Sequence, residues 1–432
     1  MNIVDLILKK KTRQKINEKE FDFFIKGVLD NSIKDYQISA FMMAICFNGL
    51  DDDESFYLTK AMTLNGETIN FDEIKDTIVD KHSTGGIGDK VSLILVPLLA
   101  SMNINVAKMS GKGLGFTGGT IDKLHSIGIK TELKDKEYID LLKKEHMFFI
   151  SQSEKIAPAD KILYSIRDTS GTIDNISLIA ASIMSKKIAT NADLIYLDVK
   201  VGDGAFFKTI KEARKFSKLC ISIGKKFNKK VIAHLTNMEK PLGRAIGNLI
   251  EIKESLDFLS RKNEPSNLKD LIYSFASDIL IDLSKAKDKQ EAYKLIDKTI
   301  NDKSAFNKFS NWSKLQGCKL DLNKIDEIYN PKYKIEILSE QNGYLEFISN
   351  ELFGYSLIDI KAGRINKEDK LDYLSGIYLN KICGDKVSVN DVILTVYSST
   401  PISDKVIESL KNNILYTNKP KKASKEILEV IR

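Results

Sequence analysis

Residues 81–90, with the sequence KHSTGGIGDK, combine a glycine-rich backbone with cationic, hydroxyl and imidazole side chains. Residues 77–80 before them have the composition of a short strand, and residues 91–100 after them that of an apolar helix. In such a turn, backbone N–H groups can converge on an anion, and the helix N-terminus adds partial positive charge. Lys81 would add a full charge, and His82 can exchange a proton near neutral pH. The segment therefore predicts a phosphate site beside a titratable group, with Ser83, Thr84 and Ser92 as hydroxyl donors.

This segment matches neither the P-loop spacing nor the Gly-x-Gly-x-x-Gly of a dinucleotide fold, so alone it would be an ordinary strand-to-helix turn. A second glycine-rich run, KMSGKGLGFTGGTIDKLHS at residues 108–126, follows the next predicted strand. It again places a lysine and hydroxyls, here Lys108, Ser110 and Thr120, between a strand and a helix. Two such turns on adjacent parallel strands open at the same edge of the sheet, where ligands bind in α/β folds. Together the two runs favour an anion site.

A third polar cluster consists of residues 164–168 (YSIRD) and 182–187 (SIMSKK). Ser182 and Lys186 are four residues apart, so they share one side of a helix. Arg167 offers a planar fork of donors and Lys186 a point charge, and both could donate to the carbonyl oxygens of a flat heterocycle. From this cluster alone, a solvated basic helix end is the better interpretation.

The elements that would position these residues follow an α/β pattern. Residues 1–65 have the apolar periodicity of amphipathic helices, and a helical insertion at 158–192 interrupts the later alternation. From residue 77, strands and helices alternate, which is typical of a mostly parallel sheet. The predicted strands are residues 77–81, 104–109, 147–151, 194–200 and 230–235, and the predicted helices are residues 89–102, 117–127, 136–145, 208–227 and 241–260, the last opened by Pro241.

This pattern predicts three domains. Residues 1–66 and 158–192 would form a helical domain. Residues 67–157 and 193–330 would form an α/β domain with a mostly parallel central sheet. Residues 331–432, where the composition shifts to β-type, would form a C-terminal α+β domain.

The composition excludes several classes of protein. The chain has 432 residues, of which 43% are hydrophobic and 29% charged, as in ordinary globular proteins. The net charge of +7 is spread along the chain without a basic block, which argues against nucleic-acid binding. The four cysteines lack metal-ligand spacing and indicate reduced thiols. No run suggests a membrane span or a secretory signal, so we expect a cytoplasmic protein.

Taken together, the motifs resemble those of the pyrimidine-nucleoside and thymidine phosphorylases. The resemblance runs along essentially the whole chain, with several long motifs in the same order. These are KHSTGGIGDK, SGKGLGFTGGTIDKL, SIRDTSGTIDNISLIAASIMSKKIA, LDVKVGDGAFFKT at residues 197–209 and PLGRAIGNLIE at residues 241–251.

The resemblance implies reversible phosphorolysis of uridine, thymidine or deoxyuridine to the free base and (deoxy)ribose 1-phosphate. Inorganic phosphate would be the co-substrate, no cofactor would be required, and the enzyme would be a homodimer formed through its N-terminal helices. The site would lie between the helical and α/β domains, with His82, Arg167 and Lys186 as catalytic residues. By motif, Lys81, Ser83, Ser92, Lys108, Ser110 and Thr120 would bind phosphate, and Tyr164, Arg167, Ser182 and Lys186 would bind the base.

Four positions depart from the family or distinguish its members. Lys108 resembles members that accept both uridine and thymidine, whereas strict thymidine phosphorylases commonly have Met. We therefore expect the broader range and keep strict thymidine phosphorolysis as the alternative. Phe116, Lys112 and His125 stand where the family usually has His, Arg and Glu.

Some members of the family bind a structural K⁺ with a glycine and a hydroxyl of the first loop and three later residues. Gly88, Leu242, Ala245 and Glu254 match this set. Lys90 stands where those members have Thr, and its ammonium could replace the ion.

Two other interpretations stay open. An enzyme like anthranilate phosphoribosyltransferase would share the architecture but would need Mg²⁺ and an acidic pair near the base site. This chain has Lys186 and Lys187 there, with Asp168 as a single acid, and Mg²⁺-independent activity would exclude this interpretation. A non-catalytic nucleoside-binding protein would also keep the fold, although every candidate catalytic position has the expected residue type.

Overall fold

The computed structural model describes residues 1–113, 118–152, 155–366, 369–421 and 424–432. The chain begins with helices whose ends are set by side-chain caps. Asn17 and Glu20 form a capping box at the second helix, and Asp51 and Glu54 form one at the fourth. These helices are α1 (Ile3–Lys11), α2 (Glu18–Leu29), α3 (Asp35–Asn48) and α4 (Asp52–Leu64).

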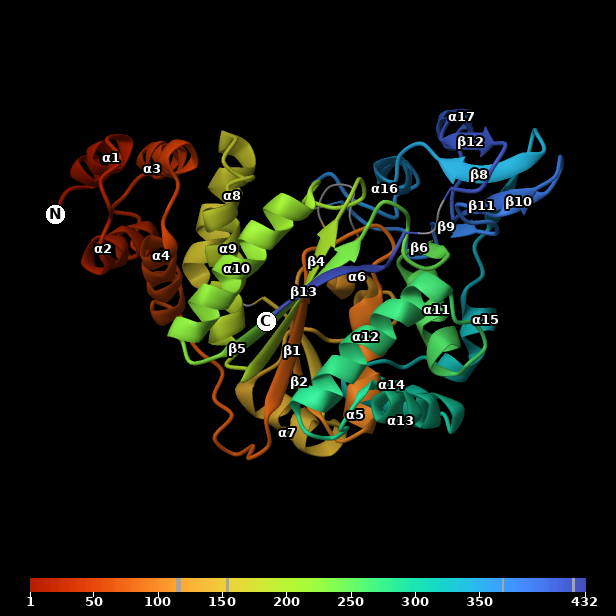
Figure 1. Ribbon diagram of the computed structural model, residues 1–432, viewed down its shortest axis with the longest axis horizontal. Helices are drawn as coiled ribbons and strands as arrows, with labels where there is room; N and C mark the ends of the chain where they lie inside the picture. The colour runs from red at the N-terminus through yellow and green to blue at the C-terminus, as the bar shows by residue number, and fades with distance from the viewer. Residues whose placement is uncertain (114–117, 153–154, 367–368, 422–423) are drawn as a thin grey trace.

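Two later helices pack against this N-terminal group, as Figure 1 shows for α8 (Pro158–Ser170) and α9 (Ile176–Ala189). Leu163 and Leu178 from these helices belong to the same buried apolar cluster as Phe41. The insertion therefore adds two helices to the N-terminal group. The boundaries proposed for the three domains stay a prediction.

The central sheet has the strand order β13-β5-β4-β1-β2-β3, and its strands are parallel except for β13, which is antiparallel to β5. Because β1 and β2 are neighbours, the two glycine-rich runs that follow them begin side by side. The strands are β1 (Ile78–Ser83), β2 (Asn105–Ser110), β3 (Met147–Ser151), β4 (Leu194–Val201), β5 (Lys230–Asn237) and β13 (Ile427–Ile431).

Helices cover both faces of this sheet. One face packs against α10 (Ile210–Lys226), which also contacts α4 and α9. Away from the N-terminal helices, the apolar helix α5 (Val91–Ser101) packs with several helices of the middle of the chain (Figure 1). The remaining helices of this part are α6 (Thr120–His125), α7 (Asp135–Glu145), α11 (Leu249–Leu259), α12 (Ser266–Asp282), α13 (Lys289–Asn301), α14 (Ser304–Leu315), α15 (Ile325–Ile328) and the 3₁₀ helix η1 (Leu322–Lys324).

The C-terminal part contains two antiparallel sheets with strand orders β10-β8-β12 and β6-β9-β11-β7. The predicted α/β fold with a mostly parallel sheet and a C-terminal α+β part is thereby confirmed. The elements are β6 (Ala245–Gly247), β7 (Tyr333–Leu338), β8 (Gly343–Phe347), α16 (Glu351–Asp359), β9 (Gly376–Leu379), β10 (Lys386–Val387), β11 (Val392–Ser398), α17 (Asp404–Asn412) and β12 (Ile414–Thr417).

The helix predicted over residues 241–260 is wrong in its first half. Pro241 opens no helix; strand β6 comes first, and α11 begins only at Leu249. Gly243 and Gly247 have φ angles of 72° and 155°, which a helix cannot accommodate.

Among the described residues, none of the helices combines the length and the apolar character that a membrane span requires.

Candidate functional site

A cavity of about 320 Å³ lies where the loops after β1 and β2 face helices α8 and α9. This volume is in the range of small-molecule sites. The cavity brings together residues from all three polar clusters that the sequence singled out. All but one of the eleven predicted catalytic and binding residues line it, namely His82, Ser83, Ser92, Lys108, Ser110, Thr120, Tyr164, Arg167, Ser182 and Lys186.

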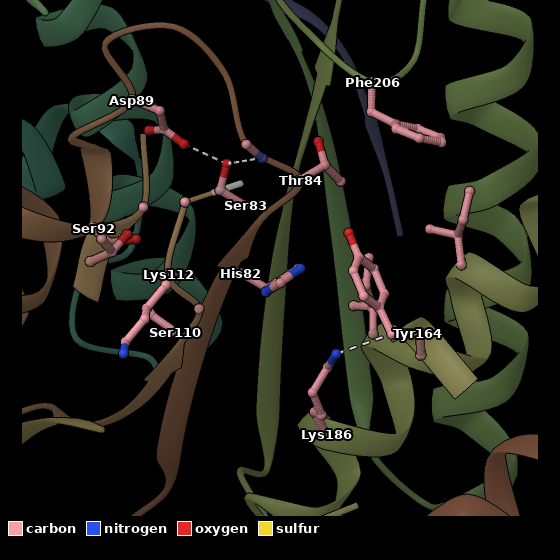
Figure 2. A pocket seen from close by; sticks show the side chains of 18 of the residues that line it. His82, Ser83, Thr84, Asp89, Ser92, Ser110, Lys112, Tyr164, Lys186 and Phe206 are labelled. Carbon is pink, nitrogen blue, oxygen red and sulfur yellow. Dashed lines mark hydrogen bonds between the residues drawn. The ribbon is translucent and has the colours of Figure 1, made fainter. Parts of the chain in front are cut away.

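Hydroxyl groups and glycines form one end of the cavity, to the left of His82 in Figure 2. Gly85 has a φ of 89°, so the turn after β1 needs a residue without Cβ there. Ser83 donates its hydroxyl hydrogen to Asp89 and accepts a hydrogen bond from the Gly85 N–H at 3.1 Å. These bonds fix the orientation of the Ser83 hydroxyl at the cavity wall.

Lys81 is the predicted phosphate ligand that does not line the cavity. Its side chain is buried, and Nζ lies 2.8 Å from Oδ2 of Asp198, which also pairs with Lys200 at 2.9 Å. Its charge is therefore compensated by Asp198 rather than presented to the cavity.

His82 lies at the centre of the cavity in Figure 2, between the hydroxyl-rich end and the end formed by Tyr164 and Lys186. Burial lowers the pKa of His82 well below its ordinary value, and the nearby charges of Lys187 and Lys108 lower it further. The imidazole is therefore neutral at neutral pH, with one nitrogen able to donate and one able to accept a hydrogen bond.

Lys108 is almost fully buried and donates to the backbone carbonyl of Met109 at 3.1 Å. Burial, and then the neighbouring Lys187, lower the pKa of Lys108 well below that of an ordinary lysine. Lys187 itself pairs with Asp80 at 2.8 Å. Lys108 thus lines the cavity as a hydrogen-bond donor that gives up its proton more easily than an exposed lysine.

Helices α8 and α9 form the other end of the cavity. The Arg167 guanidinium donates to the backbone carbonyls of Thr172, Ile173 and Leu178 at 3.2, 2.7 and 3.3 Å. A guanidinium has five N–H donors, so within the described part of the chain it keeps two for a ligand. Lys186 donates to the Ser182 hydroxyl at 3.3 Å and pairs with a carboxylate on α8.

Three residues in or next to the cavity wall were missed from the sequence. Asp160 pairs with Lys186 at 2.6 Å; it precedes Tyr164 by four residues and Arg167 by seven, so helical spacing could have revealed it. Asp89 lines the hydroxyl-rich end; burial raises its pKa, but the charges of Lys200 and Lys81 outweigh this and lower it. Phe206, on the loop after β4, lines the cavity and belongs to the motif LDVKVGDGAFFKT.

The three residues that depart from the pattern of the resembled family differ in their position relative to the cavity. Lys112 lines the cavity at its hydroxyl-rich end, near Ser110 in Figure 2. His125 lies outside the cavity lining and hydrogen-bonds Thr131 at 2.9 Å, and burial lowers its pKa. Phe116 lies outside the described residues.

The residues of the possible K⁺ site surround the Lys90 ammonium. Its Nζ donates to the carbonyls of Gly88 and Leu242, both at 2.7 Å, and lies 2.8 Å from Oε2 of Glu254. The Ala245 N–H donates to the same carboxylate oxygen at 3.1 Å. A K⁺ ion held by these oxygens would overlap with the ammonium, so the residues do not fit the ion.

Models of three protein-family domains match segments that together cover most of this chain. Residues 4–66 match the helical bundle domain of a glycosyl transferase family, and residues 75–306 match its a/b domain. Residues 344–417 match the pyrimidine nucleoside phosphorylase C-terminal domain.

Individual proteins are similar over nearly their whole length. The thymidine phosphorylase of Mycoplasmoides pirum is 44% identical over 416 residues, covering 96% of this chain and 99% of the relative. The pyrimidine-nucleoside phosphorylase of Staphylococcus haemolyticus is 42% identical over 417 residues, covering 96% of each. Among solved structures, anthranilate phosphoribosyltransferase from Thermus thermophilus matches with a TM-score of 0.59 and 13% identity, over 72% of this chain and 99% of that one. This last likeness concerns the fold alone.

Proposed function

We propose a phosphorolytic activity for this chain because it belongs to the family of pyrimidine nucleoside and thymidine phosphorylases. The reaction is the reversible attack of inorganic phosphate on a pyrimidine nucleoside, which gives the free base and a pentose 1-phosphate. The observation that supports it best is the position of His82 between a glycine- and hydroxyl-rich end of the cavity and an end with Tyr164 and Lys186 (Figure 2). Phosphate would bind at the first end and the base at the second.

The proposed chemistry requires no covalent enzyme intermediate. As the glycosidic bond breaks, positive charge develops on the sugar and negative charge on the pyrimidine. Arg167 and Lys186 would stabilise the charge on the base, while bound phosphate attacks C1′ from the opposite side and inverts it. The neutral His82 would donate a hydrogen bond to the departing base. Ser83, Ser92, Ser110 and Thr120 would orient the phosphate.

We propose the broad substrate range, with both uridine and thymidine as substrates. Lys108 in the cavity wall supports it, because a buried donor there could hydrogen-bond the additional hydroxyl of a ribonucleoside. Strict thymidine phosphorolysis is the alternative, since relatives of both names are about equally similar.

The test is release of free uracil and thymine from uridine and thymidine, with and without inorganic phosphate. Phosphate-dependent release from both nucleosides is the expected result. Release from thymidine alone would keep the chemistry and contradict the broad range. No release from either, or release that depends on Mg²⁺, would contradict the proposed function. Absence of release would favour a nucleoside-binding protein. Release that depends on Mg²⁺ would favour an activity like that of the phosphoribosyltransferases.

We further propose a homodimer formed through the N-terminal helices. Val4, Leu8, Tyr36 and Phe47 are large apolar side chains of α1 and α3 that are exposed in the single chain. Light scattering on the purified protein should give twice the mass of 48.7 kDa. A monomeric mass would contradict the proposal.

A further inference from the structure

Arg364, from the C-terminal part of the chain, reaches the loop after β2. Its Nη2 lies 2.5 Å from Oδ1 of Asp122, and both side chains are almost fully buried. Asp122 belongs to α6, the helix that begins at the proposed phosphate ligand Thr120. No described residue of the C-terminal part lines the cavity. The contact between Arg364 and Asp122 therefore lies outside the cavity lining.

The other oxygen of the same carboxylate binds the backbone of Gly113, at the first end of this loop. Asp122 Oδ2 accepts a hydrogen bond from the Gly113 N–H at 2.6 Å. A Cβ added to Gly119 would lie 2.0 Å from that nitrogen, so the two described ends of the loop are in direct contact. The Asp122 carboxylate therefore connects Arg364 with the contact between Gly113 and Gly119. We call these two glycines the neck of the loop after β2. Ser110 and Lys112 precede this neck, and Thr120 follows it.

The charges explain why Asp122 needs a partner here. A buried carboxylate without a counter-ion beside a phosphate site would repel the anion, and it would be costly to ionise. Arg364 compensates this charge, so that Asp122 can accept the Gly113 N–H without weakening anion binding.

The backbone around Arg364 is itself anchored. Asn248, just before α11, donates its side-chain amide to the carbonyl of Ala362 at 2.8 Å. The Lys361 carbonyl accepts the Asp372 N–H at 2.8 Å. Arg364 is thus presented from a fixed position, and it can impose that position on Asp122.

We propose that Arg364 is a positioning residue for phosphate, acting through Asp122 on the neck of the loop after β2. This inference rests on the proposed phosphorolysis. It assigns to the C-terminal part of the chain a role in co-substrate affinity, separate from binding of the nucleoside by α8 and α9.

The experiment compares Arg364→Gln with the wild type in steady-state kinetics and in calorimetric titration with inorganic phosphate. We expect the KM for phosphate to rise about tenfold or more, because contacting residues of one network couple strongly. The KM for the nucleoside should change much less. Arg364→Lys keeps the charge and should recover much of the phosphate affinity.

Arg244→Gln is the matched control. This arginine also joins the α/β part to the C-terminal part, through the carbonyls of Leu379 and Asn380 at 3.1 and 2.9 Å. Its side chain lies outside the cavity lining. Its loss should lower the melting temperature and leave both KM values unchanged.

The double variant Arg364→Gln/Asp122→Asn separates charge from contact. Asparagine can still accept the Gly113 N–H without needing a cation, so the double variant should bind phosphate better than Arg364→Gln alone. It also provides the test if the single variant does not fold. Wild-type phosphate affinity in Arg364→Gln, with only a lower melting temperature, would overturn the proposal. If the wild type releases no base with phosphate, the proposed function fails, while the phosphate titrations still test Arg364.

Discussion

The ammonium of Lys186 on α9 lies 2.6 Å from the carboxylate of Asp160 on α8. Asp160 is almost fully buried, whereas Lys186 is partly exposed and lines the cavity. The pair therefore sets where the Lys186 charge points before any ligand arrives. Because Asp160 also shares a face of α8 with Tyr164 and Arg167, one carboxylate organises the proposed base-binding end.

We expect Asp160→Asn to lower kcat/KM for the nucleoside by about ten- to a hundredfold, since Lys186 loses its charged partner and its position. The KM for phosphate should stay close to that of the wild type. Steady-state kinetics with each substrate varied in turn measures both values. Asp168→Asn, an exposed carboxylate on the same helix, is the control and should behave like the wild type. Equal losses for both substrates would contradict a role confined to the base-binding end.

The low pKa of His82 makes folding stability depend on pH. Because the native state holds this proton less tightly than the unfolded state, the unfolded state binds more protons below the ordinary pKa of 6.5. Stability from this group is therefore complete above that pH and is lost as the pH falls through it, by up to about 1.4 kcal/mol per pH unit.

Urea unfolding of the wild type and of His82→Gln, from about pH 5 to about pH 8, measures this effect. The wild type should lose more stability on the acidic side than the variant. Parallel curves for the two proteins would show that His82 has an ordinary pKa.

Lys90 predicts independence from alkali cations. Activity and melting temperature of the wild type should be the same in potassium chloride and in choline chloride, because the ammonium already occupies the position among Gly88, Leu242 and Glu254. Lys90→Met should destabilise the protein by about 3–5 kcal/mol, since it leaves a buried carboxylate without its cation. Lys90→Thr should regain stability when K⁺ is added. A wild type that needs K⁺ would contradict this assignment.

Lys108→Met tests the substrate range. The variant should lose activity on uridine more strongly than on thymidine, because it removes the buried donor proposed for the additional hydroxyl. The measurement is the ratio of kcat/KM for the two nucleosides in variant and wild type. An unchanged ratio would mean that Lys108 does not select the sugar.

The sequence indicated the five parallel strands of the sheet because β1, β2 and β4 each contain consecutive apolar residues and are followed by turn residues. It did not place β13 in this sheet. Local signals failed where long-range contacts determine the backbone. The turn after Pro241 is shaped by its bond to Lys90, which lies far away in the chain, and by two glycines with positive φ. No helical periodicity reveals such a bond.

The residues around the cavity were predictable to a similar degree. Residue types around His82 indicated an anion site, and ten of the predicted residues line one cavity. The sequence could not show that Lys81 turns away from the cavity, because its partner Asp198 belongs to the neighbouring strand β4. Only strand order brings the two together.

Strand β13 pairs with β5, although the whole C-terminal part lies between them in the sequence. During synthesis on the ribosome, β5 therefore emerges long before the strand that covers its edge. Until then the nascent chain exposes an unpaired edge strand, which can pair with other chains. Truncated products that end before β13 should for this reason be prone to aggregation and depend on chaperones.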